Sequence, residues 1–93
     1  QKFEKYKPTA VATISGTSVY DPPSLATATQ QSTTVTLNGA KVGDTVAVAF
    51  SNPLQGTRMW GEVTAANVVT VYHRNDTGAT VDLASGTLTV KIV

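Results

Sequence analysis

Any catalysis by this chain would depend on one histidine and six carboxylates, because the sequence contains no cysteine. His73 has Asp76 three residues away, which suggests part of a Ser/His/Asp triad. A triad also needs a serine in a strained turn that exposes its hydroxyl group, and no serine here has that context. We therefore expect His73 to be a half-buried or interface histidine, and we predict that the protein is not an enzyme.

The remaining polar motifs point to turns rather than to a reactive site. Asp21, Asp44 and Asp76 adjoin Pro, Gly or Asn, where Asp commonly accepts hydrogen bonds from the turn backbone. Asn75-Asp76-Thr77 matches the N-glycosylation pattern, and we interpret it as turn sequence. Because the sequence has no clustered metal ligands and no nucleotide-binding motif, we expect no metal and no cofactor.

Two arginines and two large aromatic residues fall on same-facing positions of one predicted hairpin. Arg58 and Trp60 alternate along its first strand, and Tyr72 and Arg74 alternate along its second. Because arginine and large aromatics are enriched at interface hot spots, we favour contact with another subunit or partner protein over a glycan-binding site. Ordinary cross-strand pairing on a solvated face is the third interpretation.

The first eight residues, QKFEKYKP, have the composition of an extended basic arm. Three lysines oppose one glutamate, and the closing proline favours an extended conformation in the residue before it. Aromatic anchors in such a segment are typical of arms that dock in a protein groove; the alternative is a frayed terminus. The residues that we expect to make these contacts are Lys2, Phe3, Lys5, Tyr6, Lys7 and Pro8.

The composition predicts a β protein. Of 93 residues, 16 are threonine and 13 are valine, and β-branched side chains favour the pleated sheet. The net charge of +1 argues against nucleic acid or an anionic membrane surface as a partner. The sequence has no apolar run long enough to cross a membrane and no signal-peptide pattern, so we expect neither a membrane span nor a retained signal peptide.

Alternating residues between turn signals predict several short strands and no helix. We expect Ser15-Gly16 to be a turn, residues 25–32 to be a polar link, and residues 44–51 to form a central strand. The fold class is thus all-β, a small antiparallel β-sandwich of jelly-roll-like or barrel-like form over residues 9–93, preceded by the arm at 1–8. The predicted strands are residues 9–14, 33–37, 44–51, 57–64, 68–74, 80–83 and 87–93.

The size of the domain predicts that it does not act alone. A chain this short buries roughly 60 to 65% of the surface that its unfolded form exposes. Disulfides are excluded by the lack of cysteine, and no metal site is expected. Oligomerisation or docking on a larger body is the remaining way to add stability.

From residue 20 onward, the order and spacing of many short motifs resemble a known module. The chain is similar to a small β-sandwich module of tailed-bacteriophage virion proteins, found at the ends of tail spikes or fibres and in head-associated proteins. The stretch 58–60, RMW, departs from the apolar and Thr-rich residues expected there. The motifs that carry the resemblance are YDPPS at 20–24, TTVT at 33–36, GD at 43–44, FS at 50–51, LQG at 54–56, VTAAN at 63–67, VTV at 69–71, Asn75, TG at 77–78 and VDLASGTL at 81–88.

The resemblance implies a rigid structural piece of a virion, without a catalytic motif and trimeric. We expect a capsid decoration or cement protein that docks on the major capsid protein and stabilises the shell, as a homotrimer on the capsid surface. The alternative is a tail fibre or spike tip, or a host-adhesion module, that binds a surface glycan or protein. Neither interpretation involves nucleic acid, a membrane or a cofactor.

Overall fold

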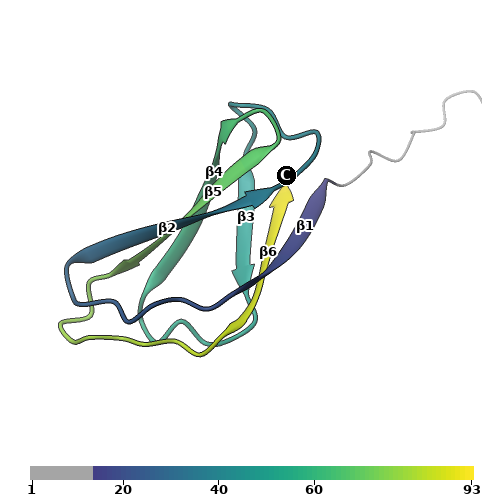
Figure 1. Cartoon of the computed structure of the whole chain (residues 1–93). Helices are drawn as coiled ribbons and strands as arrows, with labels where there is room; N and C mark the ends of the chain where they lie inside the picture. The colour runs from purple at the N-terminus through teal and green to yellow at the C-terminus, as the bar shows by residue number, and fades with distance from the viewer. Residues whose placement is uncertain (1–13) are drawn as a thin grey trace, which may run out of the picture.

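The computed structural model describes residues 14–93, and every regular element in this part of the chain is a β-strand. The predicted all-β class is confirmed (Figure 1). The arm at residues 1–8 and the predicted strand residues 9–13 lie outside the described residues. The strands are β1 (Ser15–Tyr20), β2 (Thr29–Thr36), β3 (Val46–Phe50), β4 (Arg58–Ala65), β5 (Val68–Asn75) and β6 (Gly86–Ile92).

The strands form two three-stranded antiparallel sheets, in the orders β1-β6-β3 and β2-β5-β4. β3 lies beside β4, and β1 approaches β2, so the sheets face each other as two layers (Figure 1). The chain enters the second sheet with β2, returns to the first with β3, builds the β4–β5 hairpin and ends in β6. This arrangement confirms the predicted antiparallel, sandwich-like fold.

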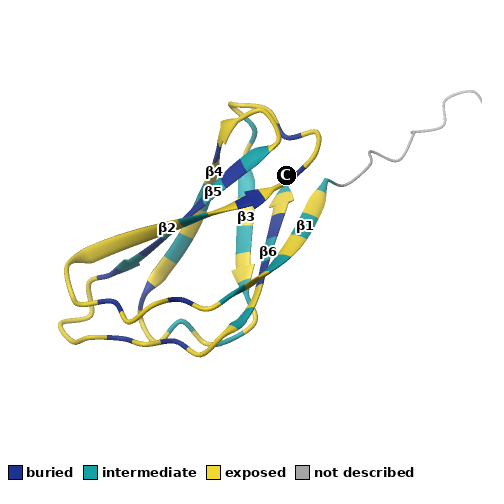
Figure 2. Cartoon of the chain, in the orientation of Figure 1, coloured by how far each residue is buried: buried dark blue, intermediate teal, exposed yellow. Residues whose placement is uncertain are grey.

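The core lies between the two sheets and consists mainly of valine and leucine. The central strands supply its middle: Val69 and Val71 come from β5, and Leu88 and Val90 come from β6. Their alternation with exposed or half-buried residues (Figure 2) follows from the two-residue period of a strand. The inward side chains of β5 and β6 thus meet at the centre of the sandwich.

One end of the sandwich is closed by two irregular segments, residues 21–28 and 76–85, which we call the end straps. They run side by side along the lower edge of Figure 1 and join through the Leu25–Val81 bridge. Each of these two residues donates its backbone N–H to the other's carbonyl, at 2.9 and 3.0 Å. Because Leu25 is only 2% exposed, the straps extend the apolar core beyond the sheets.

The turn predicted at Ser15-Gly16 is wrong, because β1 begins there. Gly16 lies in a strand that pairs with β6, and a Cβ at this position would lie 3.2 Å from the Leu37 side chain. Glycine therefore permits a close approach between the two sheets here rather than a reversal of the chain.

Three further assignments need correction. The predicted link at residues 25–32 contains a buried leucine and the first half of β2, which forms through its backbone ladder with β5 although its side chains are polar. Only Val81 of the predicted strand 80–83 makes a bridge. The predicted central strand became β3, an edge strand with β6 as its one partner. Alternation reports that one face is buried and says nothing about the number of neighbouring strands.

Gly61, on the inward side of β4, marks a close approach between the sheets. A Cβ there would lie 2.9 Å from Val48 Cγ2 and 3.3 Å from Val46 Cγ1. Gly61→Val should therefore lower the free energy of unfolding by about 1 to 3 kcal/mol, the usual cost of overpacking a core. Urea unfolding measures this, with the exposed Ala65→Val on the same strand as a control expected within about 0.5 kcal/mol of wild type. Equal losses in both variants would contradict the tight contact.

Candidate partner-binding face

The four residues predicted for the hairpin surface lie together on the outward side of β4 and β5. Arg58 is directly opposite Arg74, and Trp60 is directly opposite Tyr72. Their side chains share one face because positions two apart on a strand point the same way. We call this set of four residues the outer ladder.

The aromatic pair forms the middle of the outer ladder. The rings of Trp60 and Tyr72 stack with centroids 5.5 Å apart and an angle of 27° between their planes. Such a pair contributes about 0.5 to 1.5 kcal/mol beyond the area that it buries. Trp60 is still 38% exposed, so a large aromatic surface stays open to a partner.

The two arginines are held together by a carboxylate from one of the end straps. Like charges directly opposite each other destabilise a sheet, and Asp76 offsets this by bridging both. Arg74 Nε donates to both carboxylate oxygens, at 3.1 and 2.9 Å, and Arg58 Nη2 donates to Oδ2 at 3.2 Å. The hydrogen bond from Arg74, followed by that from Arg58, holds the pKa of Asp76 below its usual value.

The sequence pattern indicates a turn residue at Asp76, whereas the structure places its carboxylate in this cluster. The signal was present, since Asp76 is two residues beyond Arg74 and continues the same face of the strand. The predicted turn begins one residue later than expected, because Asn75 still belongs to β5.

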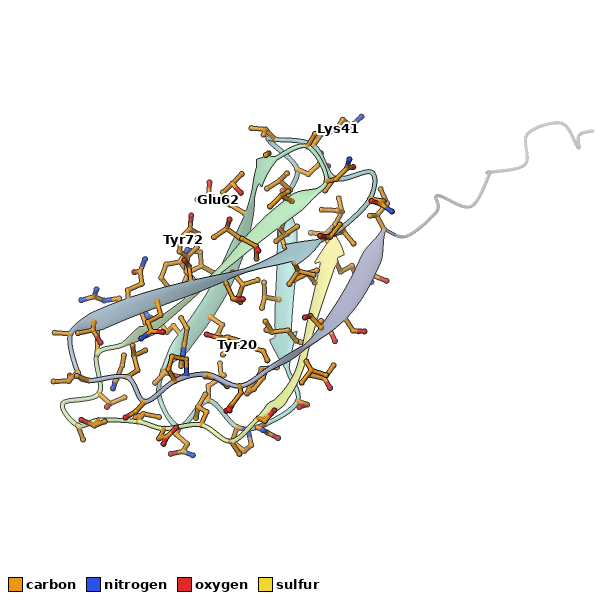
Figure 3. The ribbon with its side chains drawn as sticks, in the orientation of Figure 1. Tyr20, Lys41, Glu62 and Tyr72 are labelled. Carbon is orange, nitrogen blue, oxygen red and sulfur yellow. The ribbon has the colours of Figure 1, made fainter. Side chains whose placement is uncertain are left out.

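Two further contacts fix the ladder in place. The Arg58 guanidinium carbon lies 5.5 Å from the centre of the Trp60 ring, within reach of a cation–π interaction. The Tyr72 hydroxyl donates to Glu62 Oε1 at 2.8 Å, and Figure 3 shows these two side chains next to each other. This hydrogen bond is the main reason why the pKa of Tyr72 is raised. The side chains are therefore ordered before a partner arrives.

His73 points to the opposite side of β5 from the ladder and is 1% exposed. The prediction of a half-buried or interface histidine is corrected to a buried one. Thr57 Oγ1 donates to the Leu54 carbonyl at 2.6 Å, so it accepts the 2.8 Å hydrogen bond from His73 Nε2–H. His73 Nδ1 is then an unprotonated, buried nitrogen without a partner, and burial lowers the pKa of the ring. No local sequence pattern indicates that Thr57 would pair with His73.

Asn75, the acceptor residue of the glycosylation pattern, is completely buried. Its Nδ2 group donates to the carbonyls of Leu25 and Ala79, both at 2.7 Å. Its Oδ1 accepts from the backbone and the hydroxyl of Thr77, at 2.9 and 2.8 Å. Both hydrogens of the amide nitrogen are used inside the fold, which supports a structural role for this motif rather than glycosylation.

Comparison with known proteins finds no match, either to a protein-family model or to a curated protein sequence. The resemblance to phage virion modules therefore stays a prediction.

Two features are absent from residues 14–93. No helix in this range is long and apolar enough to span a membrane. No group of three His, Cys, Asp or Glu side chains within the range is placed to hold a metal ion. The predicted contacts of the arm lie outside it, so the docking role of residues 1–8 also stays a prediction.

Proposed function

We propose that this protein is a non-catalytic binding module of a tailed-bacteriophage virion, a capsid decoration or cement protein that contacts the major capsid protein through the outer ladder. The observation that carries the proposal is the exposed and ordered set of Arg58, Trp60, Tyr72 and Arg74. These residue types dominate binding energy at protein interfaces. The virion setting is supported by the motif resemblance from residue 20 onward.

The side chains of the outer ladder are already held in place, so less conformational entropy is lost when a partner binds. Immobilising a flexible side chain at an interface costs about 0.5 to 1.5 kcal/mol. Asp76 already holds both arginines, and Trp60 is already stacked on Tyr72. A partner that offers a carboxylate and an apolar pocket therefore meets side chains in their bound arrangement.

The test is co-sedimentation of the protein with purified capsids of the phage that encodes it. Trp60→Ala should weaken binding by about 30-fold or more, which corresponds to a hot-spot loss of about 2 kcal/mol. Val19→Ala, which removes an exposed apolar side chain from the other sheet, is the matched control and should bind as wild type does. Equal binding of both variants would refute the outer ladder as the contact surface.

A tail tip or host-adhesion module is the second candidate, favoured by the exposed Trp60 ring with Arg58 and Asp76 beside it. Such a mixed aromatic and polar surface also suits a glycan. Immunogold labelling of virions distinguishes the two functions, because the first predicts label on the head and the second predicts label on the tail. A glycan-array signal that Trp60→Ala abolishes would favour the second.

A further inference from the structure

β2 has an unpaired edge. Thr29–Thr36 pair with β5 on one side, and the described residues place no strand on the other. Only the C-terminal end of β2 approaches β1, where Gly16 faces Leu37 and the Thr36 carbonyl. The other end, residues 29–32, is exposed on both faces of the strand and extends beyond the opposite sheet (Figure 2).

The register identifies the backbone groups that point to this open edge. Leu37 N–H donates to the Asn67 carbonyl at 2.8 Å, in step with the β2–β5 pairing. Hydrogen-bonded and non-hydrogen-bonded pairs alternate along an antiparallel ladder. Residues 31, 33 and 35 therefore direct their N–H and C=O groups toward β5, and Gln30, Ser32 and Thr34 direct theirs away from it.

The open edge lacks the features that protect sheet edges from other chains. Its sequence, TQQSTTVT, contains no charged residue and no proline, which are two of the usual means of preventing edge-to-edge pairing. The other edge of the same sheet differs, because β4 carries Arg58 and Glu62 and lies beside β3. β1 also has an unpaired edge, and the residues that precede it lie outside the described range.

We propose that the open edge of β2 pairs antiparallel with β2 of a second copy of this chain, which gives a dimer in place of the homotrimer expected from the motif resemblance. Ser32 lies opposite Ser32 of the second copy, and Gln30 lies opposite Thr34. A second copy fits because the segment is uncharged, so pairing brings no like charges together. Its hydroxyl and amide side chains each donate and accept hydrogen bonds, so the segment complements itself.

This pairing would join the two sheets into one of six strands, with both outer ladders on the same face. The two β5 strands would be three strand spacings apart, about 14 Å. Two ladders at this separation would bind a repetitive surface with higher avidity than one. This consequence for binding rests on the proposed function, whereas the pairing itself does not.

Cysteine cross-linking tests the pairing and its register, because the chain has no cysteine of its own. Directly opposite residues in a hydrogen-bonded pair have Cα atoms about 5.5 Å apart, which suits a disulfide. Ser32→Cys should therefore form a covalent dimer on mild oxidation. Gln30→Cys should form none alone, because its two copies would lie about 14 Å apart, but should cross-link when mixed with Thr34→Cys.

Thr64→Cys, exposed on the far strand of the same sheet, is the matched control. The proposal is overturned if Ser32→Cys cross-links no faster than this control, or if Gln30→Cys alone cross-links as well as the mixture. Sedimentation equilibrium gives a second readout, in which the wild type should have the mass of two copies. Ser32→Lys places like charges opposite each other, so this variant should have the mass of one copy. A wild-type monomer or trimer would refute the dimer, yet would leave capsid binding through Trp60 to be judged by its own test.

Discussion

Asn75→Asp should lower the free energy of unfolding by about 3 kcal/mol or more, because a buried carboxylate oxygen would face the Leu25 and Ala79 carbonyls without a donor, which costs about 1 to 3 kcal/mol for a neutral group and more for a charged one. The substitution keeps the shape of the side chain but replaces the NH₂ group, which donates to Leu25 and Ala79, with an oxygen that can only accept. A domain of this length has a net stability of only about 5 to 14 kcal/mol. The variant should therefore be severely destabilised, or unfolded, in urea titrations at pH 7.5.

Asn52→Asp is the matched control for this experiment. Asn52 Nδ2 also donates to two strap carbonyls, those of Ala84 and Ser85, both at 3.0 Å. It is only half-buried, so water replaces the lost donor and the expected destabilisation is much smaller. If both variants lose the same stability, burial at Asn75 is not what makes its hydrogen bonds valuable.

Acidification below about pH 6.5 should destabilise the fold through His73. In the unfolded chain this ring takes up a proton near its ordinary pKa of 6.5, whereas burial lowers its pKa in the fold. The unfolded state therefore binds more protons as the pH falls below 6.5. The stability from the neutral ring is complete above that pH and is lost as the pH drops toward the lowered folded value, by up to about 1.4 kcal/mol per pH unit.

This prediction is measured by urea unfolding between pH 7.5 and pH 4.5, together with NMR titration of the ring, which is unambiguous because the chain has one histidine. His73→Gln cannot titrate and should show a flatter pH dependence over this range. Asp76 also contributes to stability, and because its pKa is lowered in the fold, this contribution is lost only as the pH falls below the ordinary aspartate pKa of 3.8. An equally steep slope in His73→Gln would show that another group is responsible.

Much of the fold could be predicted from the sequence because its central strands alternate strictly. Val69, Val71 and His73 of β5 lie on one buried face, as the two-residue period requires. The first half of β2 could not be found in this way. Residues 29–32 bury no side chain, so that half is specified by its backbone ladder and by the position of β5, which are properties of the tertiary structure.

The candidate site could be predicted only where it follows the same period. Alternation alone predicts that the four residues of the outer ladder share one face. The hairpin register then brings them into direct pairs, Arg58 with Arg74 and Trp60 with Tyr72. The partners of the buried polar groups could not be predicted. Thr57 reaches His73 from 16 residues away, and Asn75 reaches the Leu25 carbonyl from 50 residues away, so neither contact leaves a local pattern in the sequence.

Two adjacent residues face opposite ways where β5 ends. Asn75 ties the end straps together inside the domain, and Asp76 neutralises two cations outside it. A change that separates Asn75 from its two carbonyl acceptors should also displace the neighbouring Asp76. The guanidinium groups of Arg58 and Arg74 would then repel each other. The proposed binding surface and the interior thus share one peptide bond, so a substitution that spares every exposed side chain should still weaken the proposed binding.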